Sequence, residues 1–302
     1  MGYKFGYIAV LGKPNAGKST LVNLIVKNKV AIVSPKPQTT RNNIMVILTQ
    51  DNFQLVFVDT PGIHKSKNAL DKFMMKNVRS AIGGASVNVY LVDASKKLTD
   101  EEIEYIKNLK QKNEQTPLIV VLSKTDLAHD NQIVPSLSML GEIPEIDEIV
   151  PLSSLKNKNV TELIDVILKY IPSSETKNFA YDEDYYTDKS LKFIASEIIR
   201  EKSLFFLQEE IPHGISVNIV RFEEKPNLCI IEADIVCERE SHKSVIIGKK
   251  GSMLKKIGEK ARLELENVMG LKVLLKLFVK TKKNWRDSIN FLNEFGYKNE
   301  DL

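Results

Sequence analysis

Strand-length apolar runs alternate with amphipathic, helix-like segments along the first 170 residues of the chain. Strands are indicated over 5–11, 44–48, 55–58, 87–92 and 118–122, and helices over 18–26, 100–112 and 160–170. Turn residues at 49–52 predict that the second and third strands form a hairpin. The last two runs are apolar throughout, which is typical of parallel strands covered on both faces. This alternation predicts a three-layer α/β domain with a mostly parallel sheet.

The regular alternation ends at the Ile-Pro-Ser-Ser stretch of residues 171–174. The polar, acidic and tyrosine-containing residues that follow, up to 186, predict a linker that lies against a domain surface. Beyond it the pattern predicts a helix over 189–208, strands over 216–222, 228–236 and 273–279, a turn at 223–227, a helix near 252–266 and a last helix from Trp285. This second part is α+β. We expect a first domain over 1–172, a linker over 173–187 and a second domain over 188–302.

The first strand and the first helix are joined by a phosphate-binding motif. Residues 12–19 read Gly-Lys-Pro-Asn-Ala-Gly-Lys-Ser and fit G-x-x-x-x-G-K-[ST] in its required strand–helix context. Glycines let backbone N–H groups turn toward a phosphate, Lys18 neutralises the β/γ oxygens, and Ser19 can coordinate Mg²⁺. An ordinary strand–helix turn would not need the Lys-Ser pair. The candidate nucleotide contacts here are Asn15, Ala16, Gly17, Lys18, Ser19 and Thr20.

A second motif, Asp59-Thr60-Pro61-Gly62, follows the third strand. An acidic residue at the carboxyl end of a strand beside a phosphate loop is placed to hold Mg²⁺, and the Gly62 amide is placed to meet a γ-phosphate. Asp59 comes 41 residues after Lys18, with a flexible Pro/Thr-rich segment between them. The two motifs support each other and indicate a nucleoside triphosphate site.

The choice of base is indicated by Ser123-Lys124-Thr125-Asp126, which resembles the [NT]-K-x-D motif of GTPases. Asp126 would accept hydrogen bonds from guanine N1–H and the exocyclic amine, a pair that adenine does not offer. The aliphatic stem of Lys124 would pack over the purine, and Ser123 departs from the usual Asn or Thr. Residues 151–155 resemble the supporting S-A-x loop, with Ser154 in place of Ala. The candidate base contacts are Ser123, Lys124, Asp126, Leu127, Ser153, Ser154 and Leu155.

The net charge of +4 is concentrated in one stretch, because residues 239–286 hold 14 Lys/Arg against 4 Asp/Glu, a net of +10. Within it, a G-x-x-G loop lies between an apolar segment and a helix, as in KH domains that clamp about four nucleotides. The α-β-β-α-α-β order resembles the type II KH arrangement. The candidate RNA contacts are Ile247, Gly248, Lys249, Lys250, Gly251, Lys255 and Lys256, while Lys260, Arg262 and Lys276 fit either RNA contact or a solvated surface equally well.

The composition of the chain indicates the cellular compartment in which the protein is expected. No run approaches the roughly 18 apolar residues of a membrane span, and the N-terminus lacks the basic-then-apolar build of a signal peptide. The two cysteines, Cys229 and Cys237, are typical of small buried side chains in a reducing compartment. We therefore expect a cytoplasmic protein.

The spelling of the motifs resembles the bacterial Era family of GTPases over almost the whole chain. It rests on Gly12-Lys13-Pro14-Asn15, on Pro37-Gln38-Thr39-Thr40-Arg41, on Asp59–His64 and on the KH-like module. The resemblance implies a GTP/GDP site with Lys18, Thr40 and Gly62 in hydrolysis and Ser19, Thr40 and Asp59 at Mg²⁺. It also implies two switch segments, over 28–43 and 59–77, and it makes Asn15 a candidate ligand of K⁺. Ile63 stands where Ras-like proteins carry a water-orienting Gln, which predicts slow intrinsic hydrolysis.

The same resemblance implies a ribosome assembly factor that binds 16S rRNA near its 3′ end and acts on the 30S subunit as a monomer. Peripheral attachment to the inner membrane is left open. Two alternatives are an RNA chaperone or scaffold with a structural nucleotide and negligible turnover, and a small-molecule kinase built on the same phosphate loop. Asp126 and its neighbours argue against the kinase.

Overall fold

The computed structural model describes residues 2–298, and over these residues the chain divides into two compact units. The first unit contains residues up to 31 together with 40–64 and 75–188. The second contains 189 onward and, in addition, 32–39 and 65–74 from the N-terminal half. These two short segments fall within the stretches that the sequence suggested as switches. The domain boundaries inferred from the sequence stay a prediction.

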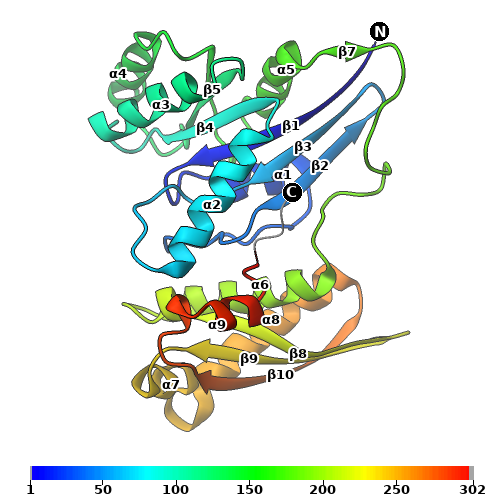
Figure 1. The fold of residues 1–302 in the computed structure, drawn as a ribbon. Helices are drawn as coiled ribbons and strands as arrows, with labels where there is room; N and C mark the ends of the chain where they lie inside the picture. The colour runs from blue at the N-terminus through cyan, green and yellow to red at the C-terminus, as the bar shows by residue number, and fades with distance from the viewer. Residues whose placement is uncertain (1, 299–302) are drawn as a thin grey trace. The chain divides into compact units, whose positions relative to one another are not determined.

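The first unit is built on a sheet whose strands follow the order β2-β3-β1-β4-β5-β6 (Figure 1). Strands β3, β1, β4, β5 and β6 run parallel, whereas β2 pairs antiparallel with β3 as the predicted hairpin. The bounds are β1 (Tyr3–Gly12), β2 (Ile44–Gln50), β3 (Phe53–Asp59), β4 (Val87–Asp93), β5 (Leu118–Ser123) and β6 (Glu148–Pro151), and the short β7 (Ser173–Ser174) pairs antiparallel with β1. Parallel pairing brings the carboxyl ends of β1, β3, β4 and β5 to one edge, where the sequence motifs begin.

Helices cover both faces of this sheet. They are α1 (Lys18–Val26), α2 (Ala69–Gly83), α3 (Asp100–Lys112), α4 (Asp130–Gly141) and α5 (Val160–Tyr170). One core cluster joins Ala9 and Leu11 of β1 to residues of α2, α3 and α4. Ile8 and Val10 point to the opposite face and are equally buried. The α/β domain with a mostly parallel sheet is thus confirmed, although α2, α4 and β6 were not expected from the sequence.

The segment predicted as a linker is bonded to the first unit. The amide of Gln54, which is fully buried, accepts hydrogen bonds from the N–H groups of Ala180 and Tyr181 and donates to the Tyr181 carbonyl. Further along, Thr187 forms a β-bridge with Val46, and the N–H of Ile47 donates to the Tyr186 carbonyl. The segment therefore adds backbone pairing to the outer edge of β2.

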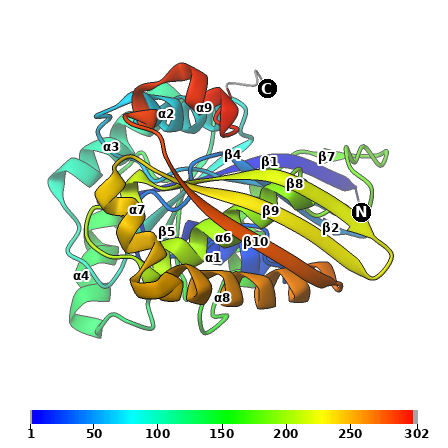
Figure 2. The ribbon, with the colours of Figure 1, turned by 90° about the horizontal axis from the view of Figure 1, so that it is seen from below.

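The second unit packs helices on one face of a sheet in the order β10-β9-β8 (Figure 2). Its elements are α6 (Leu191–Phe206), β8 (Ser216–Lys225), β9 (Leu228–Cys237), α7 (Glu240–Ile247), α8 (Ser252–Met269), β10 (Lys272–Thr281) and α9 (Ile289–Glu294). Strand β8 is antiparallel to β9, and β10 is parallel to it. The α-β-β-α-α-β order predicted from the sequence is confirmed, and Cys229 and Cys237 are buried in this core.

Two details of the second unit correct the sequence prediction. The turn expected at 223–227 is tighter, because β8 continues to Lys225 and β9 resumes at Leu228. The last helix does not begin at Trp285, which lies in a 3₁₀ turn (Trp285–Asp287) before α9. Trp285 is fully buried, and its indole N–H donates to the Gly214 carbonyl at 2.9 Å, so this bond fixes the turn before the helix can start.

Among the described residues, we find no helix whose length and apolar character would let it cross a membrane.

Candidate functional site

The phosphate loop lies between β1 and α1 in the first unit. Gly12 and Gly17 have φ angles of 142° and 99°, which side chains rarely adopt, so the sequence requires glycine there. The Lys18 ammonium is buried and donates to the carbonyls of Gly12 at 3.0 Å and Lys13 at 3.1 Å. Burial lowers the pKa of Lys18 to about 8, and the nearby Asp59 carboxylate partly opposes this. The loop thus holds the charged end of Lys18 at the N-terminus of α1.

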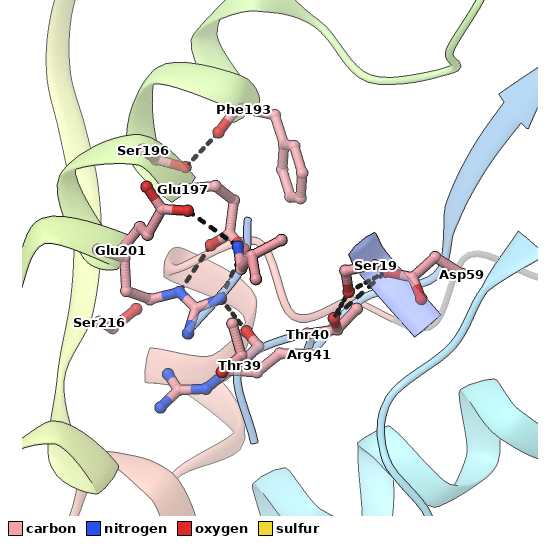
Figure 3. A network of polar contacts seen from close by, with 12 residues as sticks. Ser19, Thr39, Thr40, Arg41, Asp59, Phe193, Ser196, Glu197, Glu201 and Ser216 are labelled. Atoms are coloured by element: carbon pink, nitrogen blue, oxygen red, sulfur yellow. Dashed lines mark hydrogen bonds and ion pairs between the residues drawn. The ribbon is translucent and has the colours of Figure 1, made fainter. Parts of the chain in front are cut away.

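Next to Lys18, three predicted metal ligands converge. The Ser19 hydroxyl donates to Asp59 Oδ2 at 2.7 Å and lies 2.8 Å from the Thr40 hydroxyl, which itself lies 3.3 Å from Asp59 Oδ2 (Figure 3). These residues come from α1, from the loop before β2 and from the end of β3, so only the fold brings them together. Thr40 and Asp59 are buried.

The donor set fits a hard divalent cation. Hydroxyl and carboxylate oxygens are the ligands that Mg²⁺ prefers. Asp59 Oδ1 is buried and has no hydrogen-bond partner among the described residues, so this oxygen has an unused lone pair in the cluster. Burial raises the pKa of Asp59 to about 6, against the lowering effects of Lys18 and of the Ser19 and Thr40 hydroxyls. A cation at this position would favour the charged carboxylate.

Gly62 comes close to the phosphate loop. A Cβ atom at Gly62 would lie 2.7 Å from Pro14 Cα, so any larger residue would displace the loop. The neighbouring Ile63 N–H donates to the Gly12 carbonyl at 3.1 Å, and the Ile63 side chain packs against the core of the first unit. The His64 ring contacts the Gly62 carbonyl through Nδ1 at 2.6 Å. His64 thus takes part in local packing of the loop.

The base motif begins at the end of β5 with Ser123, which departs from the usual Asn or Thr and whose hydroxyl has hydrogen-bond partners in the fold. The Ser123 hydroxyl is buried, 2.7 Å from the Ala16 carbonyl of the phosphate loop and 2.9 Å from the Val92 carbonyl. A hydroxyl has one proton, so it donates to one of these carbonyls at a time. Ser123 thereby joins β5 to the phosphate loop.

Asp126 is oriented by Ser153 of the supporting loop, a contact that the sequence did not indicate. The Ser153 hydroxyl donates to Asp126 Oδ1 at 2.5 Å and accepts the N–H of Lys156 at 3.1 Å. Leu127 and Leu155 are 59% and 72% exposed, which leaves their side chains at the surface beside the motif. Of the remaining candidates, Asn15 adopts a left-handed turn with φ 63°, Thr20 lies in the first turn of α1, and Ser154 is half-buried.

The candidate RNA loop lies between α7 and α8 in the second unit. Gly248 and Gly251 have φ angles of 74° and 78°, and a Cβ atom at Gly248 would lie 2.7 Å from Met253 Cβ. Lys249 and Lys250 between them are exposed. The loop therefore combines a bare backbone with two solvated cations, which suits close approach of a nucleic-acid phosphate chain.

A groove of about 430 Å³ adjoins this loop. Its lining comes from one face of α8 and from β10, namely Gly251, Leu254, Lys255, Gly258, Glu259, Arg262, Leu275 and Leu277. Lys255 was predicted for the site, whereas Lys256 instead lies over the Phe206 ring at 4.4 Å. The groove also contains residues that were not predicted for the site, namely Leu254, Gly258, Glu259, Leu275 and Leu277. The helical spacing of 251, 254, 258 and 262 could have indicated the α8 wall, but the β10 wall depends on tertiary packing.

Comparison with known proteins gives matches along the whole chain. A family model described as a 50S ribosome-binding GTPase matches residues 7–124, and a KH domain model matches residues 210–286. The chain is 46% identical over 296 residues to GTPase Era of Clostridium kluyveri, covering 98% of this chain and 99% of the relative. It is 44% identical over 298 residues to GTPase Era of Clostridium botulinum, with the same shares.

Solved structures agree. A crystal structure of Era in complex with MgGDPNP and nucleotides 1506–1542 of 16S ribosomal RNA matches with a TM-score of 0.92 and 38% identity, covering 98% of this chain and 99% of that one. A variant of Aquifex aeolicus Era bound to GDP·AlF4⁻ matches with a TM-score of 0.91 and 38% identity, covering 97% and 99%. Both matches span the nucleotide-binding part and the KH part of this chain.

Proposed function

Because this chain belongs to the Era family of GTPases, we propose that it is a GTP-hydrolysing ribosome assembly factor that binds the 3′-end region of 16S rRNA and acts in 30S maturation. The Era complex with nucleotides 1506–1542 of that RNA supports the choice of target. The protein acts as a cytoplasmic monomer. The single observation that carries the enzymatic part is the convergence of Ser19, Thr40 and Asp59 beside the buried Lys18.

In hydrolysis these side chains have separate tasks. Ser19, Thr40 and Asp59 hold Mg²⁺, which when bound neutralises charge on the β- and γ-phosphates. Lys18 faces the same oxygens from the loop, and the Gly62 N–H meets the γ-phosphate. Ile63 carries no group that could orient a water molecule, so intrinsic turnover is slow. Asn15, at the turn of the loop, is our candidate for an additional K⁺ contact.

Base selection falls to Asp126, whose Oδ1 is fixed by Ser153. Lys124 and the hydrogen bond from Ser123 to the phosphate loop complete the site. Because Asp126 matches the two guanine donors, adenine would leave its carboxylate without these hydrogen bonds. The bound nucleotides are accordingly GTP and GDP.

RNA enters the groove beside residues 248–251. The glycines allow the phosphate chain to approach, Lys249, Lys250 and Lys255 neutralise it, and Leu254, Leu275 and Leu277 give bases an apolar wall. Glu259 and Arg262 in the same groove supply an acceptor and a donor for base edges. The groove can therefore distinguish bases by hydrogen bonding, in addition to binding phosphate by charge.

The nucleotide state controls RNA binding through the first switch. Within the second unit, the Val33 N–H donates to Glu201 at 2.8 Å, and Arg200 on α6 donates to the Thr39 carbonyl. Arg200 is buried and paired with Glu197, so it is a fixed donor. Thr39 directly precedes Thr40 of the metal site. GTP therefore orders the switch and favours the RNA-competent state, and hydrolysis releases it.

RNA crosslinking in cells with position mapping tests the proposal, comparing the wild type with Gly248→Asp. The substitution puts a side chain into strained backbone and a negative charge beside phosphate, so one dominant crosslink near the 3′ end of the small-subunit RNA should disappear. Gly270→Asp is the matched control, since Gly270 also has a positive φ, of 66°, but opens onto free space. Diffuse crosslinks that Gly248→Asp leaves unchanged would contradict both the target and the loop. Absence of GTP turnover even with ribosomal particles would favour the scaffold alternative.

A further inference from the structure

Asp93 ends β4 beside the base motif and holds a lysine of that motif by an ion pair. Its Oδ2 lies 2.7 Å from the Lys124 ammonium, and its Oδ1 accepts hydrogen bonds from the Ser95 N–H at 3.1 Å and the Ser95 hydroxyl at 2.6 Å. The Asp93 side chain is only 9% exposed. Burial alone would raise the pKa of this carboxyl, but the bonds from Lys124 and Ser95 lower it below its ordinary value. Both carboxylate oxygens are thus held in place.

The Lys124 side chain runs from the base motif past the phosphate loop to reach Asp93. Its backbone has a φ of 58°, and its Cε atom would lie 4.0 Å from a Cβ built on Gly17. The methylene stem therefore extends beside the loop, with its charged end held by Asp93. A lysine stem held in this way presents apolar surface although its head is charged.

We propose that Asp93 is a positioning residue for guanine-nucleotide binding, which holds the Lys124 stem extended so that it forms a preformed floor for the purine. The inference rests on the proposed assignment of Lys124 to the base. A free lysine has many rotamers, and nucleotide binding would have to order it, which costs affinity. Asp93 orders the side chain before the nucleotide arrives, and it keeps the charge of Lys124 directed away from the base.

The test is the release rate and affinity of a fluorescent GDP analogue for Asp93→Asn, measured by stopped flow and titration. We expect release to accelerate and affinity to fall about three- to tenfold, the cost of ordering one long side chain. Affinity for IDP, which lacks the exocyclic amine read by Asp126, should fall by the same factor. Ser95→Ala, which removes one bond to Asp93, should act in the same direction and more weakly.

Controls separate positioning from simple stability. Lys96→Gln removes the exposed second lysine near Asp93, at 3.5 Å, and should leave release unchanged. Lys124→Met keeps most of the stem without the charge, and in that background Asp93→Asn should no longer reduce affinity. Equal losses in both backgrounds, or no loss in either, would overturn the inference. If Lys124→Gly, which removes the stem itself, left affinity at the wild-type level, the assignment of Lys124 to the base would fail instead.

Discussion

The proposed nucleotide site and the proposed RNA groove present their charged side chains in opposite ways. In the first, Lys18, Thr40 and Asp59 are buried, and their hydrogen bonds join three separate elements. In the second, Lys249 and Lys250 are exposed on a glycine loop, and the adjoining groove is open. A buried polar group has few alternative partners, so losing one is costly, whereas water and salt replace an exposed lysine easily. The first site should respond steeply to single substitutions and the second gradually.

The largest expected effect is at the buried lysine. Lys18→Met removes the cation at the β/γ oxygens, and we expect kcat/KM for GTP to fall by about 100-fold or more, as for other transition-state donors. Phosphate release under multiple-turnover conditions measures it. Lys110→Met is the matched control, because Lys110 makes a surface pair with Asp147 at 2.8 Å. A loss in kcat/KM below about tenfold would show that burial does not make this site sensitive to a single substitution.

Substitutions in the RNA loop should reduce affinity less than those in the nucleotide site, and they should change how strongly RNA binding depends on salt. Replacing Lys249 and Lys250 together by alanine should weaken RNA binding about tenfold and reduce the slope of log affinity against log salt by about 1.4, since each single-strand phosphate contact contributes about 0.7. Fluorescence anisotropy over a salt series gives both numbers. Lys276→Ala serves as the control, because Lys276 is paired with Glu232 at 3.2 Å. An unchanged slope would mean that the loop lysines do not touch phosphate.

The coupling proposed between nucleotide state and RNA binding can be tested at Arg200. Arg200→Met with Glu197→Leu replaces the buried pair by apolar side chains, so no unpaired charge remains. RNA affinity should then differ less between the GTP-bound and GDP-bound protein, from a coupling factor of order 5–150 toward 1. The same measurement on Arg221→Met with Glu223→Leu, an exposed pair in the same unit, should leave the factor unchanged. A wild-type factor of 1 would refute the switch itself.

The smallest expected effect concerns the unusual Ser123. Ser123→Ala leaves the Ala16 carbonyl without its hydroxyl donor, so GDP affinity should fall about fivefold, the cost of roughly 1 kcal/mol. Ser123→Thr restores a common family residue and keeps the hydroxyl, and it should stay within about twofold of the wild type. Isothermal titration calorimetry measures both. A stronger loss for threonine than for alanine would show that packing, and not the hydroxyl, decides affinity here.

The sequence was sufficient where chemistry is local. The phosphate loop follows from Gly12, Gly17 and Lys18 because the turn geometry needs glycine and the motif has fixed spacing. Helices α1, α3 and α5 were expected with the bounds that the structure has, since their amphipathic patterns are clear. Helix α4 contains Pro135, and β6 has only 4 residues, so neither gives a clear periodic signal.

Contacts between residues far apart in the sequence could not be predicted from it. No pattern indicated that residues 32–39 and 65–74 belong to the second unit, because the bonds from Val33 to Glu201 and from Ala69 to Asp287 span 168 and 218 positions. The same holds for the β10 wall of the groove. It also holds for Asp93, an ordinary strand-end aspartate until the fold places Lys124 beside it.

The bonded segment after β7 has a consequence for solubility. Strand β2 is the outermost strand on one side of its sheet, and an uncovered edge offers backbone groups to other chains. The N–H groups of Met45 and Ile47 on β2 are instead engaged by Asp188 and Tyr186. The segment that connects the two halves of the sequence thus also guards the protein against edge-to-edge aggregation, and nicking it would remove that protection along with the connection.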